Sequence, residues 1–498
     1  MGLSVVEICA GAGGQALGLE LAGFDHALAV EYDDVAVATL RQNRPGWNIA
    51  AGDVTQDTVW CPEDYHGVDL LAGGVPCPPF SVAGKQLGAS DERDLLAWAV
   101  ELVGRVKPRA LLLENVRGLS MPRFSAYRQH VHDRLAELGY WSDWRVLEAR
   151  DFGVPQLRPR FVLVAFREAD AGWFEWPEPQ RFSGTIGRFL LPQMAENVWV
   201  GATRWAEGAN GLSPTIVGGS KKHGGADLGP SRARAAWAAL GVSGNSLANH
   251  APLADYPADH VPKLTIEMIA RIQGWQPETE FAWSFTGRKT AQYRQIGNAF
   301  PPPVARAIGR EIATALDHRG NRKSRGGERP TSIQDPVFAA LRASSSSLTK
   351  AEIMRLIGEN MSIEKFDNHM NKLARDFAIE SHGVGDQREY SLRSMRGLHA
   401  APDTLSRVAT RRNIPTSLAQ FTKAAVEVLG VAKPGTERIA SFRECESVAE
   451  VFGEPKPGCK PGRLPKGNAG SRARGEFPPQ GAIGCVGFCW KGHCHRLP

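Results

Sequence analysis

The sequence has no long apolar run and few cysteines for its length, and each shortage excludes a class of protein. No uninterrupted apolar stretch approaches the ~18 residues that a membrane-spanning helix needs. Eight cysteines among 498 residues are too sparse for a secreted fold held together by disulfides. The start of the chain also lacks the basic segment of a signal peptide. We therefore expect a cytoplasmic protein with reduced thiols and no membrane contact.

Charge is not strongly biased either. The formal net charge is +6 and the sequence pI is about 8.9, which permits a nucleic-acid partner without requiring one. Near the C-terminus, cysteine and histidine spacings differ from the paired Cys-x-x-Cys pattern of zinc sites, so no metal is expected. These residues are Cys485, Cys489, His493, Cys494 and His495.

Between Leu3 and Phe166, short aliphatic runs alternate with longer amphipathic ones. This alternation is typical of strand-helix units that build a parallel sheet, so we expect an α/β domain. The expected strands are Ser4–Ile8, His26–Val30, Val68–Ala72, Ala110–Leu113 and Phe161–Phe166, and the expected helices are Gln15–Ala22, Asp34–Gln42, Leu95–Arg105 and Ala126–Leu138.

Composition divides the chain into further parts. The α/β pattern predicts a first domain at 1–176, and the proline, glycine and isolated tryptophans of 177–262 predict an irregular lobe that carries recognition loops. Helical patterns at 263–318 predict a return to the first domain. The basic, glycine-containing stretch at 319–334 is expected to be a linker.

The C-terminal part begins with residues 335–395, which contain three short helical patterns and a hairpin signal near Gly383 and Gly385. Thr349 and Glu352 have the spacing of a capping box. This order suits a winged helix-turn-helix and a plain helical bundle about equally. Residues 396–498 form a C-terminal extension, which is expected to be partly disordered because glycine, proline and basic residues dominate beyond Pro455.

A glycine cluster directly follows the first expected strand, from Gly11 to Gly14. Glycines at the carboxyl end of a parallel strand let the backbone approach a nucleotide-like ligand closely. Two acids follow the next strands: Glu31 suits ribose hydroxyls, and Asp53 suits an adenine amino group. Each acid alone could be a solvated loop charge, but their order predicts a cofactor pocket.

The segment Gly73 to Ser81, with sequence GGVPCPPFS, ends the fourth expected strand. Its three prolines exclude helix and sheet ladder, so Cys77 is expected on a stiff loop at the sheet edge. A buried, inert cysteine is the alternative, but that residue normally lies within apolar strands or helices. The segment therefore predicts a nucleophilic thiol.

Three charged residues lie next to the ends of later expected strands. Glu114 follows the expected strand Ala110–Leu113 and would emerge at the same edge as Cys77, where it can hold a proton; an ordinary strand-end charge is the alternative. Arg158 and Arg160 would share one face of an extended segment, where one guanidinium suits a carbonyl and the other a phosphate or the acid.

In their order, these blocks resemble the C5-cytosine-specific DNA methyltransferase family of bacterial restriction-modification systems. The matching blocks are AGAGG at 10–14, GGVPCPPFS at 73–81, ENV at 114–116, QLRPR at 156–160 and QIGNAFPP at 295–302. The resemblance implies a Rossmann-like domain that binds S-adenosyl-L-methionine and methylates carbon 5 of a flipped-out cytosine in double-stranded DNA. The family's commonest role is to protect host DNA from a cognate restriction endonuclease.

The resemblance also assigns catalytic roles. Cys77 would attack carbon 6 of cytosine and so activate carbon 5. Glu114 would contact ring nitrogen 3 and the amino group, and Arg160 would contact the base carbonyl. Arg158, from the same block, is also expected to be a catalytic residue. Val75 would offer its backbone carbonyl to the cytosine amino group. The matching cofactor positions are Ala10, Gly11, Gly13, Glu31, Tyr32, Asp53, Leu96 and Asn298.

DNA reading is expected from the lobe, where the segment around Thr215 resembles the family's recognition signature. A solvated basic loop is the alternative for each basic residue there. The expected DNA contacts are Ser81, Gln156, Thr215, Lys221, Lys222, Arg232 and Arg234. We expect a monomer that forms no stable complex with an endonuclease.

Two residues depart from the family pattern. Cys9 stands where the family commonly has a phenylalanine that stacks on adenine, and Glu7 stands where it usually has aspartate. The first departure puts cofactor affinity in doubt. Two other functions stay open at this point: an RNA cytosine methyltransferase, and a DNA-binding transcriptional regulator that acts through the C-terminal region.

Overall fold

The computed structural model describes residues 2–75, 95–218, 225–324, 335–358, 361–395, 487–490 and 493–496. The chain splits into two compact units, Met1–Ala400 and Ala401–Pro498. Within the described residues, no helix is both long enough and apolar enough to cross a membrane.

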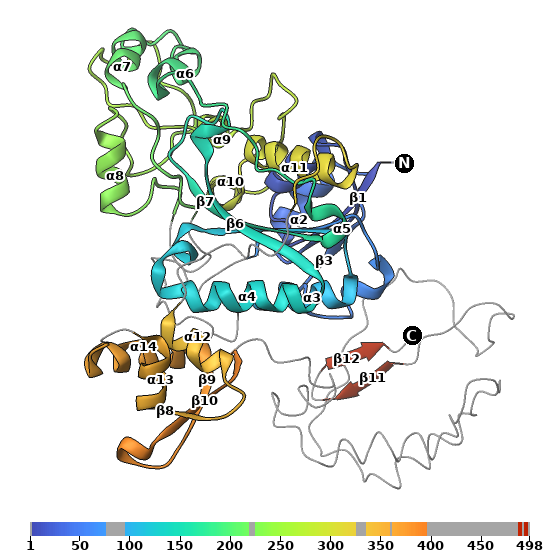
Figure 1. Cartoon of the computed structure of the whole chain (residues 1–498). Helices are drawn as coiled ribbons and strands as arrows, with labels where there is room; N and C mark the ends of the chain where they lie inside the picture. The colour runs from blue at the N-terminus through green and yellow to red at the C-terminus, as the bar shows by residue number, and fades with distance from the viewer. Residues whose placement is uncertain are drawn as a thin grey trace, which may run out of the picture. The chain divides into compact units, whose positions relative to one another are not determined.

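A seven-stranded sheet forms the centre of the first unit (Figure 1), with strand order β3-β2-β1-β4-β5-β7-β6. Five strands are parallel, as the sequence predicts. The strands are β1 (Leu3–Ile8), β2 (Phe24–Glu31), β3 (Ile49–Ala51), β4 (Leu70–Gly73), β5 (Ala110–Val116), β6 (Tyr140–Glu148) and β7 (Pro159–Arg167).

The expectation of a wholly parallel sheet is wrong at one edge, because β7 runs antiparallel to both β5 and β6. The sequence pattern also missed β6. The connection from β6 to β7 contains only the short 3-10 helix η6 (Ala149–Asp151). Parallel neighbours need a crossover of about a dozen residues or more, usually a helix, so this short link favours antiparallel pairing.

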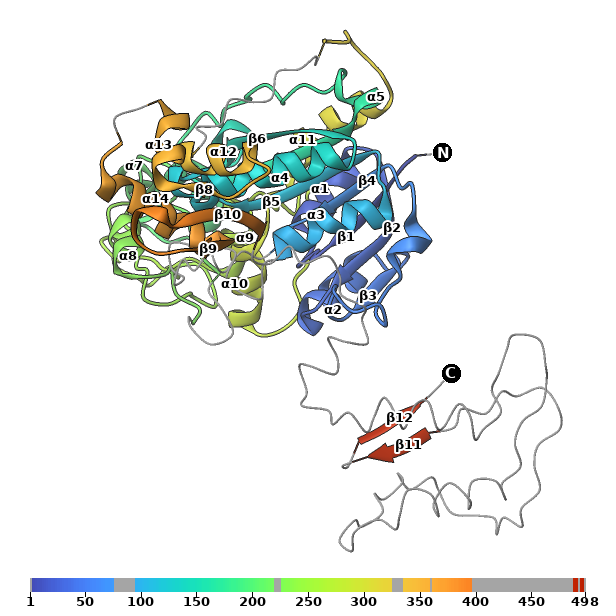
Figure 2. The same ribbon diagram turned by 60° about the horizontal axis from the view of Figure 1, so that its bottom comes forward.

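Helices cover both faces of the sheet (Figures 1 and 2). Side chains alternate between the faces along each strand, so Leu111 packs with α3 and α4 while Leu112 packs with α11. The helices of this layer are α1 (Gly14–Leu21), α2 (Asp34–Asn43), α3 (Leu95–Val106), α4 (Ser125–Glu137), α5 (Glu168–Ala171) and α11 (Pro302–Leu316).

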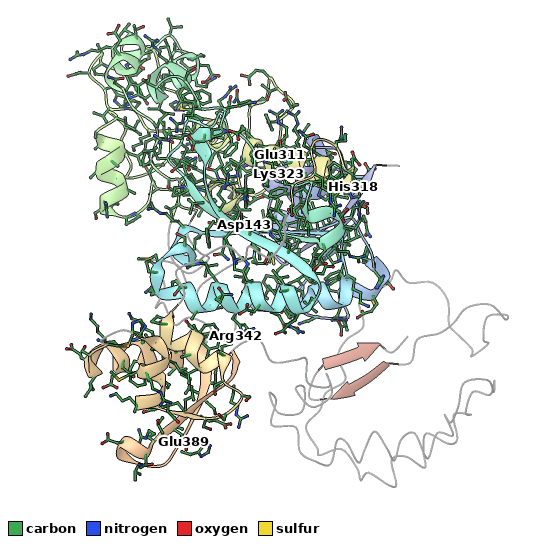
Figure 3. All side chains as sticks on the ribbon, in the orientation of Figure 1. Asp143, Glu311, His318, Lys323, Arg342 and Glu389 are labelled. Carbon is green, nitrogen blue, oxygen red and sulfur yellow. The ribbon has the colours of Figure 1, made fainter. Side chains whose placement is uncertain are left out.

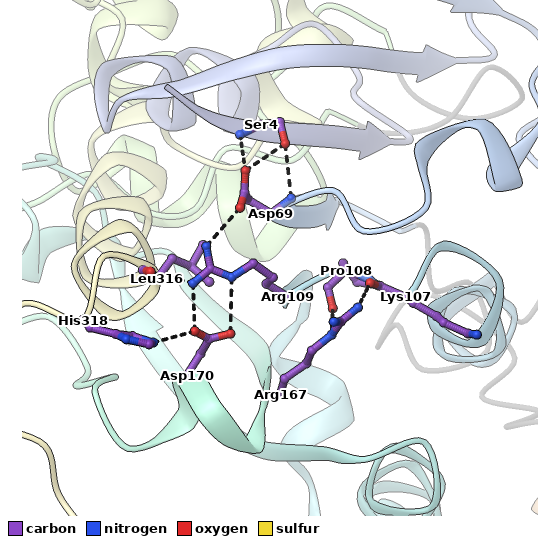
Figure 4. A network of polar contacts seen from close by, with 9 residues as sticks. All are labelled: Ser4, Asp69, Lys107, Pro108, Arg109, Arg167, Asp170, Leu316 and His318. Carbon is purple, nitrogen blue, oxygen red and sulfur yellow. Dashed lines mark hydrogen bonds and ion pairs between the residues drawn. The ribbon is translucent and has the colours of Figure 1, made fainter. Parts of the chain in front are cut away.

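An ion-pair network fastens the amino-terminal edge of the central strands (Figure 4). Arg109 contacts Asp69 at 3.1 Å and Asp170 at 2.8 Å, and it donates to the carbonyl of Leu316 at 2.6 Å. Ser4 donates to the second oxygen of Asp69. The network joins β1, β5, α5 and α11 at the sheet edge opposite the carboxyl ends of the parallel strands, so we regard it as structural.

The lobe is more regular than its composition predicts. It contains α6 (Ile186–Met194), α7 (Ala202–Gly208) and α8 (Ser231–Ala238). Its tryptophans Trp199, Trp205 and Trp237 are buried in one apolar cluster, which supplies the core of a small domain. The chain then returns through α9 (Ile266–Gln273), which begins after its cap Thr265, and α10 (Lys289–Asn298).

Residues 335–358 and 361–395 form a part that we call the small domain. Its elements are α12 (Pro336–Ala343), β8 (Leu348–Thr349), α13 (Lys350–Ile357), α14 (Ile363–Asp376), β9 (Phe377–His382) and β10 (Glu389–Met395). The predicted capping box is confirmed, with Thr349 and Glu352 bonded reciprocally. The three strands form a sheet of order β8-β10-β9, which a plain helical bundle lacks.

The small domain packs against α4. Arg342 of α12, labelled in Figure 3, lies 3.0 Å from the buried carboxylate of Asp133, and the ring of His130 packs edge-on against Phe377. In the second unit, β11 (Gly487–Trp490) and β12 (His493–Arg496) pair as an antiparallel hairpin.

Candidate active site

A cavity of about 480 Å³ opens at the carboxyl ends of β1, β2 and β4. The glycine turn, the ends of β2 and β3, and α10 line it, and Glu114 reaches it from β5. The structure thus brings together most of the residues that the sequence assigned to the cofactor and to catalysis. Those that line the cavity are Ala10, Gly11, Glu31, Tyr32, Asp53, Glu114 and Asn298.

Backbone conformation explains the glycine turn. Cys9 and Gly11 have positive φ angles of 52° and 56°, and a Cβ on Gly11 would meet nothing within 4 Å. Gly11 is therefore required for its left-handed conformation rather than for space. Gly13 is also left-handed, with a φ of 92°, and a Cβ there would in addition lie 2.6 Å from the indole of Trp283. Gly13 packs against Trp283 and is not among the residues that line the cavity, so its contact with the cofactor stays a prediction.

Glu31 is held by the backbone at the end of β2. Its two carboxylate oxygens accept hydrogen bonds from the amides of Gly11 and Asp33, each at 2.7 Å. Burial raises the pKa of Glu31, while these two hydrogen bonds oppose the shift. The carboxylate is thus fixed at the rim of the turn, with lone pairs left for hydroxyl donors.

Asp53 follows β3 and faces the same cavity. One of its oxygens accepts from the amide of Thr55 at 3.0 Å and from the Thr55 hydroxyl at 2.8 Å. These bonds orient the carboxylate. Its second oxygen accepts no hydrogen bond from the described residues and is suited to accept one from an amino group.

Glu114 and Arg160 form an ion pair across β5 and β7, with 2.7 Å between Arg160 Nε and Glu114 Oε1. The strand register makes this pair possible, since Val116 lies opposite Arg160 and Glu114 lies opposite Val162. Burial lowers the pKa of Arg160, and the charge of Glu114 opposes that shift. A guanidinium stays protonated even so, and it fixes the orientation of the acid.

Arg158 does not join this pair, although the sequence placed it on the same face. It is fully buried, and its guanidinium donates to the carbonyls of Ile216 and Gly297 at 2.7 Å and of Ala299 at 2.9 Å. Arg158 precedes β7 and therefore escapes strand alternation. Arg158 thus links the lobe, through Ile216, to the end of α10, through Gly297 and Ala299, and does not face a substrate. We call this set of hydrogen bonds the clasp.

Gln156 is buried in the same clasp. Its amide nitrogen donates to Gln273 at 2.7 Å, and its oxygen accepts from the amide of Ile216 at 3.0 Å. With no exposed surface, Gln156 does not offer the DNA contact that the sequence suggested. Thr215 is half-buried, and its hydroxyl donates to the carbonyl of Leu157 at 2.6 Å.

The expected leucine of the cofactor pocket is shifted by one position. Leu96 is packed in the core with 1% exposure, whereas Leu95, the first residue of α3, lines the cavity. Helix geometry decides this, because consecutive residues point about 100° apart. The sequence alone could not give the rotation of α3.

Three residues that line the cavity, Gln15, Glu7 and Cys9, were not assigned to the site by sequence reasoning. Gln15, with 3% exposure, faces the cavity, and neither of its amide atoms has a hydrogen-bond partner among the described residues. Glu7 is buried beside His26, 3.1 Å away, and burial raises the pKa of Glu7. Polar residues within an apolar run are a signal for both.

Cys9 also lines the cavity. Burial raises the pKa of its thiol, and the nearby acids Glu31, Asp53 and Glu7 add to the shift. The thiol therefore stays protonated and is a poor nucleophile.

Other predicted residues lie elsewhere. Arg232 is exposed and Arg234 is half-buried, both on α8 of the lobe. Cys77, Pro76, Ser81, Lys221 and Lys222 lie outside the described residues. Val75 is buried immediately before that gap, and Gly74 lines the cavity beside Glu114.

Comparison with known proteins agrees with this site. Residues 3–314 match the family described as C-5 cytosine-specific DNA methylase. Type II methyltransferase M.NaeI of Lentzea aerocolonigenes is 55% identical over 393 residues, which cover 78% of this chain and 93% of that protein.

Two shorter matches follow. Type II methyltransferase M.NgoMIV of Neisseria gonorrhoeae is 47% identical over 320 residues, covering 64% of this chain and 99% of that protein. Type II methyltransferase M.Eco47II of Escherichia coli is 33% identical over 344 residues, covering 63% of this chain and 79% of that protein. The predicted resemblance is confirmed, and the RNA and regulator alternatives are not favoured: the chain belongs to the family of C-5 cytosine-specific DNA methylases.

Proposed function

We propose that the chain transfers a methyl group from S-adenosyl-L-methionine to carbon 5 of a flipped-out cytosine at a specific site in double-stranded DNA, and that Cys77 is its nucleophile. The observation that carries the proposal is the Glu114–Arg160 ion pair, 2.7 Å long, at the edge of a cavity lined by Glu31 and Asp53. An acid fixed by an arginine lies next to a pocket suited to a nucleoside.

The donor set of the cavity fits this cofactor. Glu31 would bind the ribose hydroxyls, Asp53 the adenine amino group, and Asn298 and the turn Ala10 to Gly11 would complete the pocket. The buried amide of Gln15, without a partner among the described residues, offers one donor and one acceptor to the same pocket. When bound, S-adenosyl-L-methionine supplies an electrophilic methyl group.

The chain's own residues would prepare the base. The Cys77 thiolate would attack carbon 6, which makes carbon 5 nucleophilic. Glu114, held by Arg160, would hold the proton at ring nitrogen 3 while charge builds up in the ring, and Arg160 would also contact the base carbonyl. The protonated thiol of Cys9 would not compete with Cys77 for the base.

The lobe would hold the duplex. Extruding a base costs a few kcal/mol, which contacts in the pocket and the grooves must offset. Arg232 and Arg234 on α8 carry cationic groups suited to phosphates or guanine edges, and Thr215 lies at the junction between the lobe and the sheet. Lys221, Lys222 and Ser81 are proposed to add contacts.

The type II names of the relatives support a further proposal about the biological role. We infer that the enzyme is a monomeric modification enzyme of a restriction-modification system and protects host DNA from a cognate endonuclease without a stable complex. Host DNA that the enzyme has methylated should then resist cleavage by that endonuclease.

Bisulfite sequencing of DNA from cells that express the protein tests the enzymatic proposal. Cytosines at one sequence motif should be protected by the wild type and by Cys61→Ser, which removes a different, exposed cysteine, but not by Cys77→Ser. Duplexes that contain 5-fluorocytosine should trap a covalent adduct with the wild type and with Cys61→Ser only. Absence of any protected motif, or trapping by Cys77→Ser, would refute the proposal.

A further inference from the structure

The small domain has the element order of a winged helix-turn-helix. The order is α12, β8, α13, α14, β9 and β10, and the sheet order is β8-β10-β9. Helix α13 ends at Ile357 and is followed by Gly358, whose φ of 66° turns the chain, and α14 begins after Ser362, which caps it. In such motifs the second helix of the pair enters the major groove of DNA. The surface of α14 therefore determines whether the small domain can bind DNA.

The two sides of α14 differ in chemistry. Phe366 and Leu373 are buried and Met370 is half-buried, so this side faces the core of the small domain. The opposite side carries two amines, a guanidinium and an amide at a spacing of three, four and three residues, which places them in one line. These residues, which we call the α14 stripe, are Lys365, Asn368, Lys372 and Arg375, and all four are exposed.

The α14 stripe has the side-chain types that bind DNA. Lysine and arginine bind phosphate oxygens and guanine edges, and an asparagine amide can pair with adenine. Among the described residues, no ion pair involves Lys365, Lys372 or Arg375, whereas Lys350 of α13 is paired with Asp367 at 3.3 Å. The charges of the stripe are therefore available to a polyanion.

The small domain is also attached to the methylase region in a defined way. Arg342 of α12 pairs with the buried carboxylate of Asp133 on α4 at 3.0 Å, and Phe377 packs against His130. One relative has a length that the methylase region alone accounts for. The fold therefore adds to the methylase region an element that packs on its hydrophobic core and that this shorter relative does without.

From this placement we propose that the α14 stripe is a second DNA-binding surface, distinct from the methylation pocket, which binds the backbone and the major groove of duplex DNA. It adds affinity that depends little on sequence. The inference rests on the proposed function only in that the substrate is double-stranded DNA.

The test is the affinity of the full-length protein for duplex DNA. The stripe variant combines Lys365→Gln, Lys372→Gln and Arg375→Gln. Fluorescence anisotropy with a labelled duplex that lacks the methylation motif gives the dissociation constant at several salt concentrations. Loss of three phosphate contacts should lower the slope of log affinity against log salt by about 2.7, which corresponds to an affinity loss of about a hundred-fold at ~0.15 M salt.

A matched control removes the same charge elsewhere. Arg319→Gln, Arg322→Gln and Lys323→Gln alter exposed residues after α11 and should leave the slope close to that of the wild type. Equal losses in both variants, or no loss in the stripe variant, would overturn the proposal. A small domain that docks a protein instead of DNA gives the second of these results.

Two further measurements separate this inference from folding and from the proposed function. The stripe residues are exposed, so the melting temperature should match that of the wild type, and the single variant Lys372→Glu should weaken binding in the same direction. The turnover number of the stripe variant at saturating DNA should remain at the wild-type value. Failure of methyl transfer in the wild type would refute the proposed function while leaving the salt slopes interpretable.

Discussion

Replacing Arg158 by methionine separates a structural role of this arginine from the catalytic one that its sequence block suggests. Arg158 is fully buried and donates to three carbonyl oxygens, of Ile216, Gly297 and Ala299. Methionine fills similar volume but leaves these acceptors without their donors. Each unsatisfied buried acceptor costs about 1 to 3 kcal/mol, and release of a desolvated charge offsets part of the sum.

We expect Arg158→Met to lower the free energy of unfolding by about 3 to 5 kcal/mol, a large part of the about 5 to 15 kcal/mol that domains have. Burial lowers the pKa of Arg158 far below its ordinary value, because the loss of hydration destabilises the charged form. The same loss of hydration is the desolvation cost that its removal releases. Arg158→Lys should recover only part of the loss, because an ammonium group lacks the planar fork that reaches several carbonyls.

Urea unfolding followed by tryptophan fluorescence measures this change, since Trp237 and Trp275 are buried in the cluster beside the clasp. The control is Arg150→Met, which removes an arginine with 46% side-chain exposure from the same connection and should cost less than about 0.5 kcal/mol. Methylation by Arg158→Met should persist at temperatures well below its melting point. A variant of wild-type stability that has lost all methylation would refute the structural reading and restore a catalytic one.

Other predictions concern the cavity and α4. Gln15→Leu should weaken S-adenosyl-L-methionine binding about ten-fold in calorimetry, because it removes a buried donor and acceptor; unchanged affinity would contradict the role of Gln15. Glu114→Gln should reduce the turnover number by about 10² to 10⁴ while cofactor binding stays intact, and near-normal turnover would remove Glu114 from the mechanism. Burial, with help from the charge of Arg342, lowers the pKa of His130 to about 4 in the folded chain. In the unfolded chain His130 has its ordinary pKa of about 6.5, so between these two pH values only the unfolded chain binds the proton. Stability is therefore full above about pH 6.5 and falls by up to about 3 kcal/mol as the pH drops toward 4. In His130→Gln, urea unfolding at pH 5 and pH 7.5 should show a smaller difference; an equal difference would exclude His130 as its source.

The sequence by itself determined the features that depend on neighbours along the chain. The expected helices Asp34–Gln42 and Leu95–Arg105 agree with α2 and α3 to within one residue, because helical hydrogen bonds join residues four apart. The capping box of Thr349 and Glu352 was visible for the same reason. The order of acids after successive strands predicted the cavity, because the carboxyl ends of parallel strands meet at one edge.

Only the tertiary structure decided the features that depend on distant segments. The bonds of Arg158 join residues 58, 139 and 141 positions away, so no local pattern separates it from Arg160. The rotation of α3, which turns Leu95 and not Leu96 toward the cavity, is set by packing against the sheet. The antiparallel β7 and the two-residue strand β8 exist through pairing with partners far along the chain. Such contacts are chosen by the packing of the whole core, which local propensity does not specify.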